Sequence, residues 1–420
     1  MLSHYIIMSY KYYDIIIIGT GMSGLYSAYN IKKTSPNTSF LILEKYKKQW
    51  IGGRTSNDNF YGTEIVTGAG IGRKNKDKLL LNLLKTFGFT LKEFIVKENY
   101  SPLIKRVDID KLIKTLRHEL HKYNGAPITF KNFAKNILGE KTYKLLITQM
   151  GYTDYENEDV FETLYYYGLE DNYSSWKAFS VPWKLLVSKL AHYIGESHFK
   201  FSNNVTKINK IAENPCKFLV ESESGNKYMC NKVIIATTIT SLRKIFPNKP
   251  IYNDIEGQPF LRLYGKFSKN SIPIIKQYIH GVTILPGPLQ KILPMNEDKG
   301  IYMIAYNDNN NTISLKNNLE NNEKNRELYC RLIEKSLDIP NGLLTLVAIK
   351  EYYWPIGTHY YKPLDTKIYK NIDEFIYEAQ HPEKGILVVG EVVSHDQGWT
   401  EGALTSVKAV LTKSWIKNEC

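Results

Sequence analysis

Three glycines close to the start of the chain have the spacing of a loop that binds a dinucleotide. They are Gly19, Gly21 and Gly24. An apolar run at 14–18 precedes them. A helix-like segment begins at Met22 and Ser23 and includes the third glycine. In such a loop the first glycine permits a tight turn, the second lets the backbone approach a pyrophosphate, and the third lets the helix pack on the strand. Because a helix N-terminus also presents free N–H groups to phosphates, the pattern predicts a dinucleotide site, with a merely structural turn as the alternative.

An acidic residue follows the next apolar run. That run, FLIL at 40–43, is followed directly by Glu44 and Lys45. Glu44 stands about twenty residues after the glycine loop, where a carboxylate can hydrogen-bond the ribose hydroxyls of a bound nucleotide. An acid at this place disfavours a 2′-phosphate, so NADP is not the expected ligand.

Three more short motifs narrow the prediction. They are IGGRTS at 51–56, TGAGIG at 67–72 and, near the other end, GILVVGEVVSHDQGWTEGALTSVKAVL at 385–411. Together with the glycine loop and the acid, these motifs resemble the flavin-containing amine oxidoreductase superfamily, which includes the monoamine and polyamine oxidases. The resemblance implies FAD as the cofactor. It also implies an α/β fold, in which an FAD-binding Rossmann-like domain of the glutathione-reductase type is interleaved with an α+β substrate domain.

The resemblance assigns residues along the whole chain to the FAD site. Arg54 would hold a phosphate or the flavin edge through its fork of donors, and Glu391 would bind the ribityl or pyrophosphate region. The backbone of Val205 would contact the adenine. The N–H groups from Thr400 to Ala403 would face the pyrimidine edge of the flavin or its ribityl chain. The complete implied set is Gly19, Gly21, Met22, Ser23, Gly24, Glu44, Lys45, Gly53, Arg54, Gly68, Ala69, Val205, Gly390, Glu391, Trp399, Thr400 and Ala403.

Two aromatic residues match the positions where the family has the walls of its substrate pocket. Tyr360 lies in EYYWPIGTHYY at 351–361, and Trp399 lies in DQGWTEGA at 396–403. Flat aromatic walls orient an amine, favour a partly cationic nitrogen and exclude water. The resemblance therefore implies that Tyr360 and Trp399 form a cage; the alternative is that both are packing residues in a chain that is 13% aromatic.

The chain departs from the family at a lysine that many members place on a strand near flavin N5 and that is linked to oxygen reactivity. The matching strand is QPFLRLYGKFSK at 258–269, and Arg262 stands in the lysine position. Lys266 follows four residues later, on the same face of the expected strand. Arginine keeps the charge but not the compact ammonium, so oxidation by oxygen does not follow from the resemblance alone.

The elements that must position these residues come from separated parts of the chain. Near-continuous apolar runs at 14–18, 40–43, 217–220, 233–236 and 386–389 are typical of parallel strands covered on both faces. Apolar residues recur at helical spacing in 76–89 and 183–195. The expected organisation is an FAD-binding domain made of 1–72, 198–250 and 384–420, a helical part of the substrate domain at 73–197, and its sheet part at 251–383.

Composition limits the partners. The formal net charge is +13, but the lysines are spread along the chain without a basic block, which makes nucleic acid an unlikely partner. No run of 18 apolar residues and no signal-peptide pattern occurs, so we expect a soluble cytoplasmic protein without a membrane partner. The four cysteines lack metal-ligand spacing, and no metal is expected. Nothing in the sequence indicates an oligomeric state.

The leading prediction is an FAD-dependent oxidoreductase that oxidises a small-molecule amine, with polyamines among the candidates. Hydride transfer to flavin N5 would give an imine and then an aldehyde, with hydrogen peroxide if oxygen is the acceptor. Two alternatives stay open: a flavoprotein oxidase, desaturase or isomerase that acts on a non-amine, and an FAD-binding module with weak or no catalysis.

Overall fold

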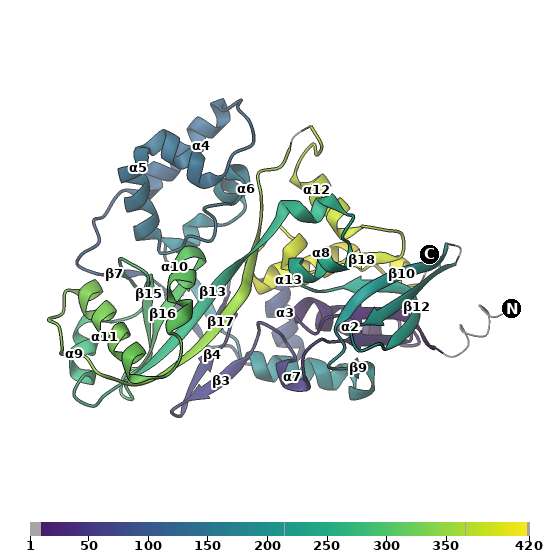
Figure 1. Ribbon diagram of the computed structural model, residues 1–420, viewed down its shortest axis with the longest axis horizontal. Coiled ribbons are helices and arrows are strands. Elements are labelled where there is room, and N and C mark those ends of the chain that lie inside the picture. Colours follow the sequence, from purple (N-terminus) through teal and green to yellow (C-terminus); the bar gives the residue numbers. More distant parts are fainter. Residues whose placement is uncertain (1–9, 214, 366, 418–420) are drawn as a thin grey trace.

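The computed structural model describes residues 10–213, 215–365 and 367–417. Two large sheets dominate the molecule, and helices cover them (Figure 1). One sheet has seven strands and the other has six. The seven-stranded sheet lies at the right of Figure 1, and the long strands β13 and β17 of the other sheet run diagonally across its middle.

The seven-stranded sheet is assembled from three separated stretches of chain. Its order is β10-β11-β12-β1-β2-β9, and β18 pairs with β12. The strands are β1 (Lys11–Ile18), β2 (Phe40–Leu43), β9 (Phe199–Lys200), β10 (Val205–Glu213), β11 (Cys216–Ser222), β12 (Lys227–Ile235) and β18 (Ile386–Val388). β1 lies parallel to both β2 and β12, and β18 lies parallel to β12. The predicted parallel strands at 14–18, 40–43, 233–236 and 386–389 are therefore confirmed.

The run at 217–220 was predicted as a parallel strand, and this prediction is wrong. It forms β11, which is antiparallel to both β10 and β12. Its burial alternates along the strand, with Cys216, Phe218 and Val220 buried and their neighbours half-buried. The apolar Leu219 on the second face made an alternating strand look continuous, while short connections to both neighbours allow only antiparallel pairing.

Each face of this sheet is closed by its own helices because alternate side chains of β1 point to opposite faces. Ile15 and Ile17 lie in one core and Ile16 and Ile18 in the other. The first core receives α2 (Met22–Thr34), α3 (Lys78–Thr86), α7 (Trp183–Ile194), α13 (Thr400–Val410) and α14 (Lys413–Lys417). The second receives α8 (Ile239–Ile245) and α12 (Ile372–Gln380). The helices predicted at 76–89 and 183–195 are α3 and α7.

The six-stranded sheet has the order β17-β13-β16-β15-β14-β7. Its strands are β7 (Asn99–Tyr100), β13 (Ile255–Phe267), β14 (Thr283–Ile284), β15 (Lys291–Asn296), β16 (Ile301–Asp308) and β17 (Leu346–Tyr361). β13 and β17 are antiparallel along almost their whole length, from Ile255 opposite Tyr361 to Phe267 opposite Leu346. Helices α9 (Ile272–Tyr278), α10 (Asn309–Leu315) and α11 (Glu323–Leu337) lie around this sheet (Figure 1).

A separate group of helices lies at the upper left of Figure 1, beyond the six-stranded sheet. It contains α4 (Ile109–Lys122), α5 (Phe130–Met150) and α6 (Val160–Tyr165), which share one apolar core. Two small sheets complete the fold: β3 (Asn57–Phe60) with β4 (Thr63–Val66), and β5 (Ile71–Arg73) with β8 (Trp176–Ser180) and β6 (Glu93–Val96).

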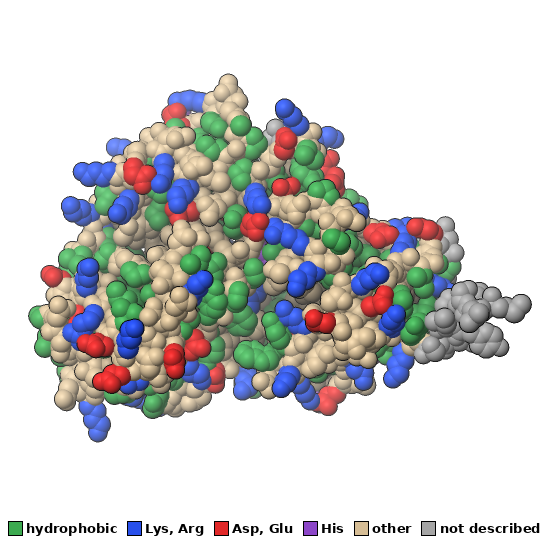
Figure 2. Space-filling view, viewed as in Figure 1, with side chains coloured by type: hydrophobic (Ala, Val, Ile, Leu, Met, Phe, Trp, Pro, Cys, Tyr) green, Lys and Arg blue, Asp and Glu red, His purple; other side chains and the backbone are tan. Residues whose placement is uncertain are grey.

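The surface carries its positive charge in a dispersed form. Figure 2 shows lysine and arginine side chains scattered over one face of the molecule, with acidic side chains between them. None of the helices described is both long and apolar enough to cross a membrane.

Candidate functional site

The glycine loop is packed against its neighbours on one side and open on the other. A Cβ on Gly24 would lie 2.0 Å from the carbonyl oxygen of Gly19, and a Cβ on Gly19 would lie 2.4 Å from that of Ala236. At Gly21, by contrast, a Cβ would meet no atom within 4 Å among the described residues. Two of the three glycines thus allow the strand and helix to pack closely, while the second faces free space.

The turn at 52–54 docks onto the glycine loop. The N–H of Gly52 donates to the carbonyl of Thr20 (2.9 Å), and Gly21 and Gly52 form a parallel β-bridge. Gly53 has a φ of +59°, and its Cβ position would lie 3.7 Å from the Cα of Gly21. The structure therefore brings together two motifs that lie about thirty residues apart in the sequence.

Glu44 is buried at the end of β2 and already has protein partners. Its Oε2 accepts from the N–H (2.8 Å) and the hydroxyl (2.7 Å) of Thr20, and its Oε1 accepts from the N–H of Tyr46 (2.9 Å). Each carboxylate oxygen has two lone-pair directions, so Oε1 can still accept one more hydrogen bond. The exposed Lys45 places its ammonium over the Tyr46 ring. Val205 is buried at the start of β10.

A buried ion network joins the turn at 52–54 to the end of the chain. Arg54 Nη1 lies 2.9 Å from Glu391 Oε1 and donates to the carbonyl of Gly357 (2.7 Å). His359 Nδ1 lies 2.5 Å from the same carboxylate oxygen, and the N–H of Gly398 donates to Glu391 Oε2 (3.2 Å). Burial acts to raise the pKa of Glu391, but the hydrogen bond of His359, the charge of Arg54 and the hydrogen bond of the Gly398 N–H outweigh it and hold that pKa well below its usual range.

His359 is fully engaged in this network. Its Nε2 accepts a hydrogen bond from the N–H of Ile239 (3.2 Å), so the lone pair is on Nε2 and the proton is on Nδ1. Nδ1 therefore donates to Glu391. Because both ring nitrogens have protein partners, His359 acts here as a positioning residue for Glu391.

The early turn of α2 lies beside the late glycine motif. A Cβ on Gly390 would lie 3.6 Å from the hydroxyl of Ser23, and the N–H of Gly390 donates to the Ser406 hydroxyl (2.8 Å). Met22 and Ser23 are buried in the first turn of α2, and Ala403 is buried in the first turns of α13. Helices α2 and α13 pack against each other, and neither has a side-chain N-cap hydrogen bond within the described chain.

Arg262 reaches the turn that carries Gly68 and Ala69. Its Nε donates to the carbonyl of Gly68, and its guanidinium carbon lies 4.2 Å from the centre of the Tyr306 ring. The N–H of Ala69 donates in turn to the carbonyl of Arg54 (2.8 Å). This turn therefore connects the arginine in the family's lysine position with the arginine of the 52–54 motif.

The carbonyls beside Gly68 are held by other side chains. Tyr264 donates to Val66 (2.6 Å), the Trp354 indole N–H donates to Thr67 (2.7 Å), and the Trp183 indole N–H donates to Gly70 (3.1 Å). Lys266 lies further along β13 and donates to the carbonyl of Lys299. The turn at 66–70 is thus fixed from two strands and one helix, while the Lys266 ammonium binds elsewhere.

The two predicted cage residues have different surroundings. Tyr360 is half-buried near the end of β17, opposite Glu256 of β13. Trp399 directly precedes α13; the Arg73 guanidinium carbon lies 3.9 Å from its ring centre, and Trp176 meets it edge-on. No ring contact between Tyr360 and Trp399 occurs among the described residues. The cage stays a prediction.

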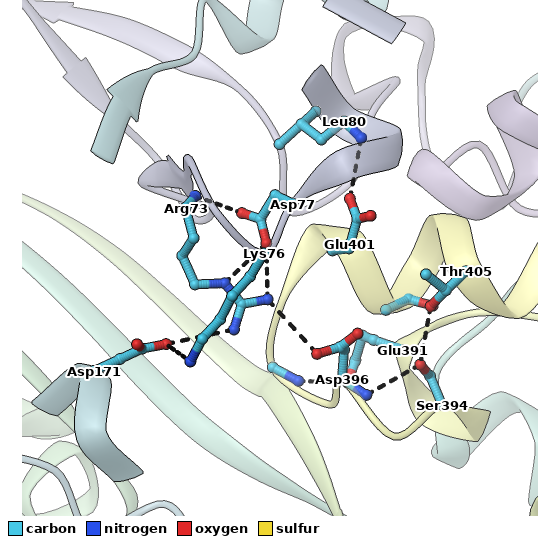
Figure 3. Close-up of polar contacts among 12 residues, drawn as sticks. Arg73, Lys76, Asp77, Leu80, Asp171, Glu391, Ser394, Asp396, Glu401 and Thr405 are labelled. Carbon is cyan, nitrogen blue, oxygen red and sulfur yellow. Dashed lines mark hydrogen bonds and ion pairs between the residues drawn. The ribbon is translucent and has the colours of Figure 1, made fainter. Parts of the chain in front are cut away.

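Arg73, which lies over the Trp399 ring, is also the centre of a charged cluster. Its Nη2 lies 2.8 Å from Asp77 and 3.7 Å from Asp396, and its Nη1 lies 3.6 Å from Asp171 (Figure 3). Lys76 pairs with the same Asp171 carboxylate (2.7 Å). The guanidinium is buried, so this cluster fixes it as a rigid support on which the Trp399 ring stacks.

Glu401 joins the same region by capping α3. Its Oε1 accepts from the N–H of Leu79 (2.7 Å) and its Oε2 from that of Leu80 (3.0 Å; Figure 3).

We expect Glu401→Ala to destabilise the protein by about 1–2 kcal/mol, since two N–H groups and a helix dipole lose their acceptor. Thermal unfolding measures this loss. Glu401→Gln keeps one acceptor, so its unfolding midpoint should lie between those of the wild type and Glu401→Ala. An unchanged midpoint for Glu401→Ala would contradict the capping role.

Sequence reasoning missed several buried ionisable groups near the site. Burial lowers the pKa of Lys291 to about 7, against the opposing effect of Asp308, Glu98 and Asp154. The Lys291 ammonium lies over the Tyr152 ring. Lys291 gave no signal, because a lysine at the start of a short strand is usually exposed. Asp154 had one, because it belongs to the segment DYENEDVFE at 154–162, which has five acidic residues in a strongly basic chain.

Comparisons with known proteins place this geometry in a known fold. Two solved structures of putrescine oxidase, a double and a triple mutant with redesigned cofactor binding, superpose with TM-scores of 0.73 and 0.72. They cover 95% of this chain and 98% and 97% of their own, at 14% and 15% sequence identity. An uncharacterized protein of Acanthamoeba polyphaga mimivirus is 39% identical over 57 residues, which is 14% of this chain and 11% of that protein. No family model matches the chain.

Proposed function

Because this chain has the fold of putrescine oxidase over nearly its whole length, we propose that it is an FAD-dependent oxidoreductase that oxidises an amine. One observation carries the proposal: three motifs far apart in the sequence meet at one place. The loop at Gly21 bridges to Gly52, and Arg54 pairs with Glu391. A fold alone does not imply a function, and it is this convergence of residues that supports a flavin site.

The residues at this place fit FAD. The space in front of Gly21 would admit a pyrophosphate, and the uncapped N-termini of α2 and α13 leave N–H groups for phosphate or ribityl oxygens. Glu44 keeps an acceptor for a ribose hydroxyl, and Arg54, which is 30% exposed, keeps donors beyond its pair with Glu391. Gly53, Gly68, Ala69, Gly390 and Val205 would line the same cofactor.

When bound, FAD would accept a hydride equivalent from the carbon next to the amine nitrogen. The part of this chain is to bind and orient that amine. Tyr360 and Trp399 would supply flat walls, and Arg73 would hold the Trp399 ring from its other side. The network of Arg54, Glu391 and His359 would keep the 357–360 end of β17 in place, so that the Tyr360 wall is preorganised.

The proposal is tested by asking whether the purified protein holds FAD. We expect a yellow protein that releases FAD, in an amount equal to the protein, when it is denatured; chromatography of the released flavin identifies it. A colourless protein that takes up no FAD on addition would overturn the proposal, because every step depends on this cofactor.

Arg262 favours a second candidate, a flavin-dependent oxidoreductase that passes its electrons to an acceptor other than oxygen. Its guanidinium is held by the Gly68 carbonyl and the Tyr306 ring. It therefore cannot replace the compact ammonium of the lysine that many amine oxidoreductases have near flavin N5. We expect Arg262→Lys to reoxidise faster than wild type when the reduced protein is mixed with oxygen in a stopped-flow instrument. Equal reoxidation rates in the variant and the wild type would contradict a position of Arg262 near flavin N5.

A further inference from the structure

A crevice lies between the helical region and the ends of the two long strands. Its lining comes from four separate parts of the chain, at 154–167, 258, 358–360 and 395–398. They contribute Asp154, Glu158 and Tyr167, then Gln258, Thr358, His359 and Tyr360, and finally His395, Gln397 and Gly398. Tyr360 is one predicted cage wall, and Gly398 directly precedes the other. The crevice therefore adjoins the place where the reacting amine is expected.

Two buried carboxyl groups face this crevice. Asp154 is 8% and Glu158 is 5% exposed. Burial, followed by the charge of Asp308, raises the pKa of Asp154 to about 7. Burial raises the pKa of Glu158 as well, and the neighbouring acids Glu162 and Asp154 add to this effect. Each group is therefore costly to ionise alone, and a cation placed between them would stabilise the charged form of both.

Their present hydrogen bonds leave acceptor capacity. Asp154 Oδ1 accepts from the Tyr167 hydroxyl (2.6 Å), and Glu158 Oε2 accepts from the Thr163 hydroxyl (2.8 Å). A carboxylate offers about four acceptor positions, so each group can accept further donors from a ligand.

Gln258 supplies an independent sign of a ligand. Its Nε2 donates to the main-chain carbonyl of Asp154 (2.5 Å) and to the Thr358 hydroxyl (3.3 Å). A carbonyl can only accept, so the amide nitrogen must face it and the amide oxygen is left over. That oxygen, Gln258 Oε1, is buried without a hydrogen-bond partner in the described part of the chain, and Gln258 is 4% exposed. An unpaired buried acceptor is costly, and a donor from a ligand would remove the cost.

The crevice thus offers hydrogen-bond acceptors to a ligand with several donors, and two carboxyl groups that a bound cation would ionise. No group of three or more histidine, cysteine, aspartate or glutamate side chains in the described residues is arranged to hold a metal ion. An ammonium group has three donors and a positive charge, which matches two carboxylates and one amide oxygen. The attraction for a cation would come from these residues themselves, since the chain as a whole carries a formal charge of +13.

We propose that Asp154, Glu158 and Gln258 bind a second ammonium group of the substrate, so that the enzyme selects linear diamines or polyamines over monoamines. This inference rests on the proposed function, which places the reacting amine between Tyr360 and Trp399. The substrate would extend from these walls past Gly398 into the crevice. Charge and hydrogen bonding at the far end would then set its orientation.

Calorimetric titration of the holoenzyme tests the subsite directly. The probes are linear α,ω-diamines of increasing length and the monoalkylamine of the same length in each case. The wild type should bind at least one diamine about tenfold or more tightly than its matched monoamine, as a charge-assisted hydrogen bond predicts. Asp154→Asn, Glu158→Gln and Gln258→Leu should each lose most of this preference while monoamine affinity stays nearly constant.

A matched control comes from the same acidic segment. Glu156 is also buried, but it binds the Tyr143 hydroxyl (2.6 Å) and does not line the crevice. Glu156→Gln should therefore keep the diamine preference. Circular dichroism and the flavin content of each variant show whether it has folded.

The outcomes separate this inference from the proposed function. Equal binding of diamines and monoamines by the wild type, or equal losses of both in the three variants, would overturn the ammonium subsite. A diamine preference that the variants lose, in a protein whose flavin no amine reduces, would support the subsite and overturn amine oxidation. Reduction of the flavin by diamines and monoamines that bind with equal affinity would support amine oxidation and overturn the subsite.

Discussion

Gly21→Val is expected to abolish FAD binding while the flavin-free protein keeps its stability. Residue 21 has an extended backbone, with φ −66° and ψ 175°, that any residue can adopt, and a Cβ there would meet no described atom within 4 Å. The side chain would instead fill the space that the pyrophosphate needs. Since overpacking costs about 1–3 kcal/mol, even Gly21→Ala should weaken FAD binding by about 5- to 150-fold. Fluorescence titration with FAD and thermal unfolding of the flavin-free protein measure the two effects.

Gly24→Ala is the contrasting variant in the same loop. Its Cβ would lie 2.0 Å from the Gly19 carbonyl oxygen, so this change should damage the fold itself. If Gly21→Val bound FAD as tightly as wild type, the free space before Gly21 would not be the cofactor site. If it unfolded like Gly24→Ala, the loop would be only a structural turn.

Removal of the Glu391 carboxylate should give the largest loss of stability at the site. Glu391→Ala would leave the buried imidazole of His359 and the guanidinium of Arg54 without their shared acceptor. Breaking a buried ion pair by removing one partner costs about 3–5 kcal/mol, and we expect a loss of that size. The midpoint of denaturant unfolding measures it. A loss of less than about 1 kcal/mol, typical of a surface pair, would contradict a buried network.

The stabilising effect of Glu391 should depend on pH in a defined direction. Despite burial, which acts to raise it, His359 and Arg54 hold the pKa of Glu391 in the folded protein below its ordinary value of 4.5. The folded state therefore binds fewer protons than the unfolded state, and the contribution is full above pH 4.5 and lost as pH falls below it. Unfolding of wild type and Glu391→Gln, compared at several pH values, should show a gap that narrows in acid. A gap independent of pH would show that the charge of Glu391 contributes nothing.

Local motifs predicted the glycine loop and the parallel strands, because in these elements the spacing of residues in the sequence determines where they lie in space. The loop at Gly19, Gly21 and Gly24 follows a buried strand and opens a helix, as its spacing requires. The parallel strands were predictable because strands covered on both faces need continuous apolar runs. The antiparallel β11 was not, since one apolar residue on its second face hides the alternation.

The site was predictable only where a motif marked it. Arg54 and Glu391 belong to short motifs, and their ion pair agrees with the predicted convergence. The stacking of Arg73 on Trp399 depends on where β5 meets the start of α13. No motif in the sequence indicates that these two residues lie together. The crevice likewise needs Asp154 and Gln258, and the Gln258 side chain meets the main-chain carbonyl of Asp154 across more than one hundred residues of chain. Its acidic segment was visible in the sequence, but an acidic run is usually a solvated surface.

Anaerobic mixing of the FAD-loaded protein with amines tests directly whether the protein oxidises an amine. The visible flavin absorption is followed after addition of linear diamines, polyamines and monoamines, with dithionite as the control for a reducible flavin. We expect at least one of these amines to bleach the absorption as fully as dithionite does. Bleaching by dithionite and by none of the amines would contradict amine oxidation and leave a flavoprotein with another substrate or with none.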